Sequence, residues 1–388
     1  MNAQPSSLRV AIIGTGMIAA AHLRAARDAG AAVVGVLGSV PERSAEAAER
    51  WGVPTGYSSL PELLEARPDI VHICTPNNTH THYALAVAEA GFHMVVEKPI
   101  ATSLTEAREL AATVQAAGTV ATVPYVYRYH PLVREIRSRR EAGEMGELLL
   151  LHGSYLQDWL LSPDASTWRV DPRTGGASRA FADIGSHWAD LAEFVSGERF
   201  TALMAATSIA YPTRPVASGP SFSGGAHGER VPVETEDIAV ATFRTERGVL
   251  ANTVISQVSA GRKNRLWLEL DGTRQSAVFD QEQPESAWFG TERGATVVRR
   301  GEGDVAADQA RFNRVPPGHP QGWPDAFAAF CADTYAAVKG EQPTGLPTVD
   351  DGLRSVEIID ALLHSAATGD WTGIGTAVSV FTTKTEKP

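Results

Sequence analysis

The sequence predicts an α/β protein: a doubly wound parallel sheet, followed by an α+β region with a largely antiparallel open sheet. Short apolar runs alternate with helical segments over the first 126 residues, as in parallel sheets covered by helices. Later segments at 236–244, 249–259 and 263–271 alternate apolar and polar residues, which is typical of antiparallel strands. The length of 388 residues exceeds what one core usually supports. We therefore predict two domains, 1–126 and 127–388.

Composition limits the partners and the location. The net charge of −11 argues against nucleic acid or an anionic membrane as the partner. Cys74 and Cys331, the two cysteines, lie in apolar surroundings, which suits a reducing cytoplasm and predicts neither disulfides nor a cysteine-based metal site. No apolar run approaches the ~18 residues of a membrane span. The short polar N-terminus does not resemble a signal peptide, so we expect a cytoplasmic protein.

The stretch from Leu8 to Ala29 organises the first domain. An apolar run leads directly into Gly14-Thr15-Gly16-Met17-Ile18-Ala19, and an alanine-rich helical segment follows. This order is typical of a Rossmann dinucleotide-binding unit, because Gly14 permits a sharp turn and Gly16 lets backbone N–H groups approach a pyrophosphate. The alternative is a glycine turn in another kind of α/β protein. The residues expected at the dinucleotide are Gly14, Gly16, Met17 and Ile18.

The second strand, 32–37, ends without the acid that usually binds the adenosine ribose of NAD. Gly38 and Ser39 stand there instead, and Arg43 follows. The missing carboxylate removes repulsion toward a 2′-phosphate, which Ser39 and Arg43 could bind. We therefore expect NADP or NAD as the cofactor, with NADP favoured. Alternatively, Arg43 is a solvated residue of a helix at 41–51.

Two further strand ends carry polar residues. The strand 70–74 leads into Thr75-Pro76-Asn77-Asn78-Thr79-His80, and the strand 93–96 leads into Glu97-Lys98-Pro99. Ligands of open parallel sheets bind beyond the carboxyl ends of the strands, so we expect cofactor contacts from Thr75, Pro76, Asn77, His80, Glu97 and Lys98. Lys98 is a candidate for polarising a substrate oxygen, although a Glu-Lys pair also occurs on solvated surfaces. His80 and His82 lack further ligands at metal-binding spacing, so we predict no metal.

The second half carries two more motifs. Trp168-Arg169 and Gly175-Gly176-Ala177 precede the segment Asp183-Ile184-Gly185-Ser186-His187-Trp188-Ala189-Asp190. With the glycine turn, Cys-Thr-Pro-Asn and Glu-Lys-Pro, these motifs resemble the glucose-fructose oxidoreductase, inositol dehydrogenase and rhizopine-catabolism family, written Gfo/Idh/MocA. Two features depart from the family pattern: the run is Gly-Gly-Ala rather than three glycines, and the strand-tip acid is missing.

The resemblance implies an NAD(P)-dependent oxidoreductase whose six-stranded Rossmann domain precedes an α+β domain. It implies that the open sheet of the second domain often mediates oligomers, so we expect a homo-oligomer, either dimer or tetramer. It also implies that the late segment packs back on the first domain. The residues implied for catalysis are Lys98, Asp183 and His187, and those implied near the cofactor are Trp168 and Arg169.

Asp183 and His187 are four residues apart, so on a helix they share one face. A neutral imidazole can accept a hydroxyl proton while hydride leaves the same carbon, and Lys98 would stabilise the developing alkoxide. A single histidine on such a helix would more often be a core or surface residue. If His187 is the base, oxidation should fall as the pH drops through the ordinary imidazole range near ~6.5.

Aromatic and hydrogen-bonding side chains suit a polyhydroxylated substrate ring. Beside Lys98, Asp183 and His187, the candidates are Arg128, Tyr155, Asp158, Trp159 and His319. Arg128 could instead brace a helix at 131–142 between the domains, and Trp159 could be a hydrophobic anchor. The expected reaction is hydride transfer between the nicotinamide and a secondary ring hydroxyl of a sugar, sugar derivative or cyclic polyol. The alternatives are a non-sugar substrate such as a trans-dihydrodiol, and a dinucleotide-binding regulator without chemistry.

Other expectations concern the connections. We predict a sixth strand at 119–125, a hairpin turn at Asp271-Gly272 and two late helices, at 323–339 and 350–367. The Ser/Gly/Pro-rich stretch 212–228 predicts a loop, and the tail 382–388 is expected to fray.

Overall fold

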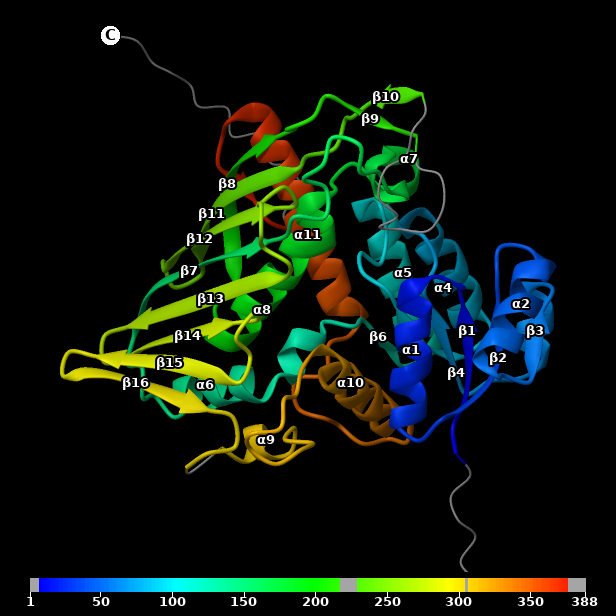
Figure 1. The fold of residues 1–388 in the computed structure, drawn as a ribbon, viewed down its shortest axis with the longest axis horizontal. Coiled ribbons are helices and arrows are strands. Elements are labelled where there is room, and N and C mark those ends of the chain that lie inside the picture. Colours follow the sequence, from blue (N-terminus) through cyan, green and yellow to red (C-terminus); the bar gives the residue numbers. More distant parts are fainter. Residues whose placement is uncertain (1–6, 217–228, 304–305, 376–388) are drawn as a thin grey trace, which may run out of the picture.

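The computed structural model describes residues 7–216, 229–303 and 306–375. Figure 1 shows two sheets, with helices beside and between them. The first sheet has six parallel strands in the order β3-β2-β1-β4-β5-β6. The second has nine strands in the order β16-β15-β14-β13-β7-β12-β11-β8-β17, and its neighbours are antiparallel except for β7 and β12. The predicted fold class is therefore confirmed.

The first sheet alternates strands and helices as predicted. Its elements are β1 (Arg9–Ile13), α1 (Met17–Asp28), β2 (Ala32–Leu37), α2 (Pro41–Trp51), β3 (Thr55–Tyr57), α3 (Leu60–Glu65), β4 (Ile70–Ile73), α4 (His80–Glu89), β5 (His93–Val96), α5 (Leu104–Ala117) and β6 (Ala121–Thr122). The sixth strand is shorter than the predicted 119–125. Val123 donates its N–H to the Pro347 carbonyl at 3.1 Å, and Pro124 has no N–H to donate, so the ladder ends there.

The elements after β6 build the second sheet and its helices. They are α6 (Pro131–Glu141), β7 (Leu148–Leu156), α7 (Pro172–Gly175), α8 (Ser186–Ser196), β8 (Phe200–Ser208), β9 (Thr213–Pro215), β10 (Arg230–Pro232), β11 (Ile238–Thr245), β12 (Leu250–Ser256), β13 (Arg265–Gly272), β14 (Ser276–Asp280), β15 (Ser286–Thr291), β16 (Gly294–Arg299), α9 (Ala307–Ala310), α10 (Trp323–Val338), α11 (Val349–Thr368) and β17 (Thr372–Gly373). Short single turns lie at 77–79, 126–129, 168–170 and 181–185.

Two predicted connections differ from the structure. The stretch expected as a loop from 212 begins with β9, which pairs with β10 in a two-stranded ribbon; residues 217–228 lie outside the described residues, as does the predicted fraying tail. The turn predicted at Asp271-Gly272 is also wrong. Both residues belong to β13, and Gly272 donates its N–H to the Gln275 carbonyl, so the reversal comes at 273–275.

Helices from both halves of the chain cover the parallel sheet. Helix α1 packs with the late helix α10 on one face, and α4 and α5 pack with the late helix α11 on the other. Figure 1 shows α10 lying beside α1. The second sheet packs one face against α6, α8 and α11. The late segment thus places side chains next to the ends of the parallel strands.

The other face of the nine-stranded sheet exposes apolar side chains. The cross-strand register places Met204, Val240, Val254, Leu250 and Leu150 on this outer face, followed across the sheet by Trp288 and Val297. We refer to these seven residues as the outer apolar face. Among the described residues, no helix is both long and apolar enough to cross a membrane.

Candidate active site

A cavity of about 980 Å³ lies at the carboxyl ends of the parallel strands. Its walls come from the residues that follow β1, β2, β4 and β5, and from β7 and α8 in the second half of the chain. This is the edge at which open parallel sheets bind ligands. All the predicted cofactor contacts line it: Gly14, Gly16, Met17, Ile18, Ser39, Arg43, Thr75, Pro76, Asn77, His80, Glu97, Lys98, Trp168 and Arg169.

The glycine turn fits a dinucleotide phosphate. Gly14 has a φ of +119°, and a Cβ there would lie 2.6 Å from the Cys74 carbonyl oxygen, so only glycine fits the turn. A Cβ at Gly16 would meet no atom within 4 Å, which leaves open space in front of α1. No side chain caps the N-terminus of α1. Its N–H groups are therefore available to a pyrophosphate.

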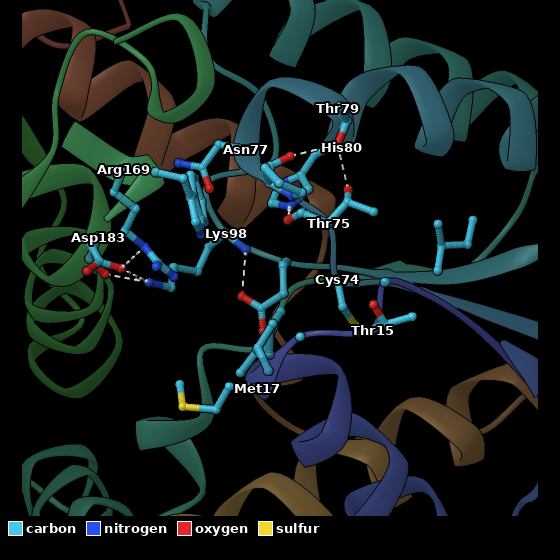
Figure 2. A pocket seen from close by; sticks show the side chains of 18 of the residues that line it. Thr15, Met17, Cys74, Thr75, Asn77, Thr79, His80, Lys98, Arg169 and Asp183 are labelled. Carbon is cyan, nitrogen blue, oxygen red and sulfur yellow. Dashed lines mark hydrogen bonds and ion pairs between the residues drawn. The ribbon is translucent and has the colours of Figure 1, made fainter. Parts of the chain in front are cut away.

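His80 joins two strand ends rather than standing free in the cavity. Its Nδ1 lies 2.7 Å from the Pro99 carbonyl oxygen and its Nε2 lies 2.8 Å from that of Thr75. Figure 2 shows Thr75, Thr79 and His80 together on one side of the cavity. The imidazole therefore holds the turn after β4 against the turn after β5.

Lys98 and Asp183 bring the two halves of the chain together. The Lys98 Nζ lies 2.5 Å from the Asp183 carbonyl oxygen and 3.1 Å from Asp183 Oδ1. The Arg169 Nε lies 3.5 Å from the same carboxylate oxygen, and Gln257 donates to Oδ2 at 2.9 Å. Figure 2 shows Lys98, Arg169 and Asp183 converging on one side. Burial alone would raise the pKa of Asp183, but the two cations hold this pKa well below its usual range.

His187 follows one helical turn after Asp183, at the start of α8. Its ring lies edge-on to Tyr125 and Tyr127, with centroid separations of 5.7 and 5.2 Å. Its Nδ1 is buried and has no hydrogen-bond partner among the described residues. The Asp183 carboxylate accepts hydrogen bonds from Lys98 and Gln257. In the described ranges of the chain, no hydrogen bond joins this carboxylate to His187.

The electrostatic setting of His187 changes the expected pH dependence. Burial, reinforced by the charge of Lys98, lowers the pKa of His187 to about 3. The imidazole is therefore neutral throughout the usual assay range. With this pKa, the fall in oxidation expected from protonation of His187 moves to a pH well below the ordinary imidazole range.

A hydrogen-bonded group of uncharged side chains lines the cavity near His187. The Tyr127 and Tyr155 hydroxyls are 2.7 Å apart, and Tyr155 donates to Asn264 Oδ1 at 2.7 Å. Gln157 Nε2 donates to the same oxygen at 2.8 Å, while its own Oε1 is buried and finds no partner within the part of the chain that the structure describes. Trp159 lines the same cavity with 39% of its surface exposed. These groups offer hydrogen bonds and aromatic surface to a neutral ligand.

Comparison with known proteins agrees with this geometry. Residues 8–125 match the family described as "Oxidoreductase family, NAD-binding Rossmann fold", and residues 133–278 match the "GFO/IDH/MocA C-terminal domain". Levoglucosan dehydrogenase of Pseudarthrobacter phenanthrenivorans is 32% identical over 360 residues, which cover 86% of this chain and 87% of that protein. The chain belongs to the Gfo/Idh/MocA family.

Solved structures of family members superpose on nearly the whole chain. A levoglucosan dehydrogenase in complex with NADH and levoglucosan has a TM-score of 0.86 and 27% identity, covering 96% of this chain and 100% of that chain. An inositol dehydrogenase homologue from Azotobacter vinelandii, complexed with NADH and myo-inositol, has a TM-score of 0.80 and 27% identity, covering 95% and 98%. This Gfo/Idh/MocA chain is an oxidoreductase with an NAD-binding Rossmann fold.

Three predicted substrate contacts of this Gfo/Idh/MocA protein do not line the cavity. The Arg128 guanidinium is buried between the Asp190 and Asp351 carboxylates, so it braces helices α8 and α11. The Asp158 carboxylate is 2.5 Å from the Lys263 Nζ. The exposed His319 contributes its carbonyl oxygen to Arg300 at 2.6 Å. Each side chain therefore lies away from the cavity in which substrate would bind.

Sequence reasoning also missed residues that line the cavity. Glu46 and Arg50 of α2 line the cavity together with Arg43. These three residues have i, i+3, i+7 spacing and therefore share one helix face, which is a signal that the sequence does contain. Asn264 carries no motif, because strand pairing alone brings it to Gln157, 107 positions earlier in the chain. Trp323 and Phe327 reach the cavity from α10, which packs against α1.

Proposed function

We propose that this protein transfers hydride between NAD(P) and a secondary ring hydroxyl of a neutral sugar, sugar derivative or cyclic polyol. The observation that carries the proposal is the meeting of Lys98, from the end of a parallel strand, with Asp183 and the neutral His187 in one cavity. The uncapped helix and open glycine turn stand in the same cavity. The named substrates of its relatives, levoglucosan and myo-inositol, belong to the same class of compound.

The proposed mechanism assigns a separate task to each side chain. His187 accepts the hydroxyl proton, because its imidazole is neutral and faces the cavity. Lys98 stabilises the alkoxide that develops on the same oxygen. Asp183 holds the Lys98 amine in place through its carbonyl and carboxylate oxygens. Bound NAD(P)+ supplies the acceptor for the hydride that leaves the carbinol carbon.

The proposed substrate contacts are the uncharged side chains beside the catalytic group. Tyr155 and Asn264 are joined by a hydrogen bond, and Gln157 offers a buried acceptor with no protein partner. Trp159 supplies an aromatic surface. Such a wall suits hydroxyl groups and the apolar faces of a ring.

For the cofactor we propose NADP in preference to NAD. Two cations, Arg43 and Arg50, line the cavity beyond the end of β2, and Gly38 and Ser39 replace the usual acid there. Glu46 is the acid of α2 that lines the same region. The solved relatives hold NADH, which makes NAD the second candidate.

We also propose that two or more copies associate through the outer apolar face. Its exposed residues gather on β8, β11, β12 and the start of β7, and again on β15 and β16. His152, Glu269 and Asp271 lie between these two groups on the same face. Exposed apolar patches rimmed by polar residues mark association sites. Light scattering coupled to size exclusion distinguishes a dimer or tetramer from a monomer. The domain boundary at 126/127 and the cytoplasmic location stay predictions.

A substrate panel tests the proposed function. Purified protein is incubated with NAD+ or NADP+ and with levoglucosan, glucose, methyl glucosides, myo-inositol or a trans-dihydrodiol, and the absorbance of the reduced nicotinamide is followed. We expect turnover with at least one neutral sugar or polyol. Turnover with the dihydrodiol alone would favour a non-sugar substrate. Cofactor binding without turnover on any compound, in either direction, would favour a dinucleotide-binding regulator.

A further inference from the structure

A line of buried polar side chains runs from the cavity wall into the interior, behind the catalytic lysine. Glu97 Oε1 lies 3.0 Å from His22 Nε2, and His22 Nδ1 lies 2.9 Å from His72 Nδ1. His72 Nε2 lies 3.2 Å from the Tyr335 hydroxyl. We call these four residues the buried chain. They come from α1, β4, the end of β5 and α10, so the chain joins the first sheet to a late helix.

The hydrogen-bond capacities of the buried chain allow a direction that ends on an anionic Glu97. Each neutral imidazole carries one N–H, and an ionised carboxylate only accepts. If Tyr335 donates to His72 Nε2, then His72 donates from Nδ1 to His22, and His22 donates from Nε2 to Glu97. This assignment pairs every one of the contacting atoms and ends on an anionic carboxylate. The second carboxylate oxygen of Glu97 accepts the Lys98 N–H at 3.1 Å.

Packing alone does not explain why the side chains of the buried chain are polar. His22 and His72 are fully buried, and burying polar groups is costly unless each finds a partner. Apolar side chains of similar size would fill the same space without this requirement. Yet Glu97, at the end of the chain, lines the cavity. The interior side chains therefore act on a group that a bound ligand meets.

We propose that His22, His72 and Tyr335 are positioning residues that hold Glu97 as an anion, so that the cavity wall carries no net positive charge that would disfavour the oxidised, positively charged nicotinamide relative to the reduced, neutral one. The inference rests on the cofactor binding proposed above. Lys98 and Arg169 are positive, and Asp183 and Glu97 are negative, so charge balances around this part of the cavity only while Glu97 is ionised. Losing the Glu97 charge leaves a net positive wall, which repels a cation.

Other titratable groups also face Glu97, and the variants of the test leave these residues unchanged. Besides the buried chain, they are Lys98, His80, Cys74 and His187. None of these is altered in the variants below.

The test measures the dissociation constants of both redox forms. Tryptophan fluorescence titrations of NAD+, NADH, NADP+ and NADPH are made with wild type, Glu97→Gln, His22→Leu and His22→Gln, between pH 6 and 9. We expect Glu97→Gln to weaken the oxidised form by about tenfold at every pH and to leave the reduced form within twofold. His22→Leu should weaken the oxidised form equally at low pH, because Glu97 has lost its hydrogen-bond donor and binds a proton. The affinity should recover as the pH rises, because Glu97 then ionises even without the His22 donor. His22→Gln keeps an N–H donor and should resemble wild type.

Two further variants separate positioning from folding. Tyr335→Phe removes only the first donor and should shift the ratio of the two constants in the same direction, by less. His82→Leu, a change at an exposed histidine of α4, should shift nothing. Equal weakening of both redox forms, or an unchanged ratio in Glu97→Gln, would overturn the inference. Failure of wild type to bind any of the four cofactors would instead overturn the proposed function.

Discussion

The neutral state of His187 makes a quantitative prediction about stability at acid pH. Burial lowers the pKa of this imidazole to about 3 in the folded chain, whereas an exposed imidazole of the unfolded chain has a pKa near ~6.5. Below that value the unfolded chain binds a proton that the folded chain refuses, so stability is lost as pH falls. Between pH 7 and pH 4.5 the loss is about 2–3 kcal/mol, because each pH unit well below the unfolded pKa costs about 1.36 kcal/mol and only part of that slope applies near this pKa.

Urea unfolding at pH 7 and at pH 4.5 measures this loss. In His187→Leu the His187 contribution disappears, so the drop in unfolding free energy between the two pH values should be smaller than in wild type by about 2–3 kcal/mol. His130→Leu is the matched control, because burial also lowers the pKa of His130 to about 3 but this residue does not line the cavity. It should reduce the pH dependence equally and keep turnover at pH 7. Equal pH dependence in wild type and His187→Leu would refute the reasoning.

Three other substitutions test separate parts of the account. Gly38→Asp should shift the ratio of NADP to NAD affinity toward NAD by about tenfold, the effect of one unfavourable charge pair. Gly38→Ala is the control for crowding, since a Cβ at this position lies 3.0 Å from the Ser44 nitrogen. An equal shift in the two variants would contradict the charge argument. Lys98→Met should lower turnover by about 10²- to 10³-fold without weakening cofactor binding, and unchanged turnover would remove Lys98 from the mechanism. Arg128→Met should lower the free energy of unfolding by about 3–5 kcal/mol, because Asp190 is left unpaired. The KM of the folded variant should not change. A raised KM with unchanged stability would instead support Arg128 as a substrate contact.

The parts of the site that sequence could predict are those set by local motifs and sheet topology. The positive φ of Gly14 belongs to a tight turn whose glycine is visible in the sequence. Lys98 follows a buried parallel strand, and parallel strands bring their carboxyl ends to one edge. Asp183 and His187 share a helical turn. Each of these positions is decided within a few residues of chain, so the pattern was sufficient.

The remaining errors come from long-range packing. Arg128 has the chemistry of a ligand-binding residue, but its carboxylate partners lie 62 and 223 positions further along the chain. Asn264 reaches the cavity through the register of β13 beside β7. The low pKa of His187 comes from burial and from Lys98 in the other half of the chain, and its ring contacts three tyrosines from other elements. None of these partners follows from periodicity or motif spacing.

The central claim is that Lys98 and His187 act on one substrate oxygen. Single-turnover hydride transfer, followed at the reduced nicotinamide band, tests it with wild type, Lys98→Met, His187→Leu and the double variant. Groups that act as a unit have strongly non-additive effects. We predict that the double variant is no slower than the slower single variant, within about threefold. Losses that multiply in the double variant, or a single variant that transfers hydride at the wild-type rate, would contradict the claim.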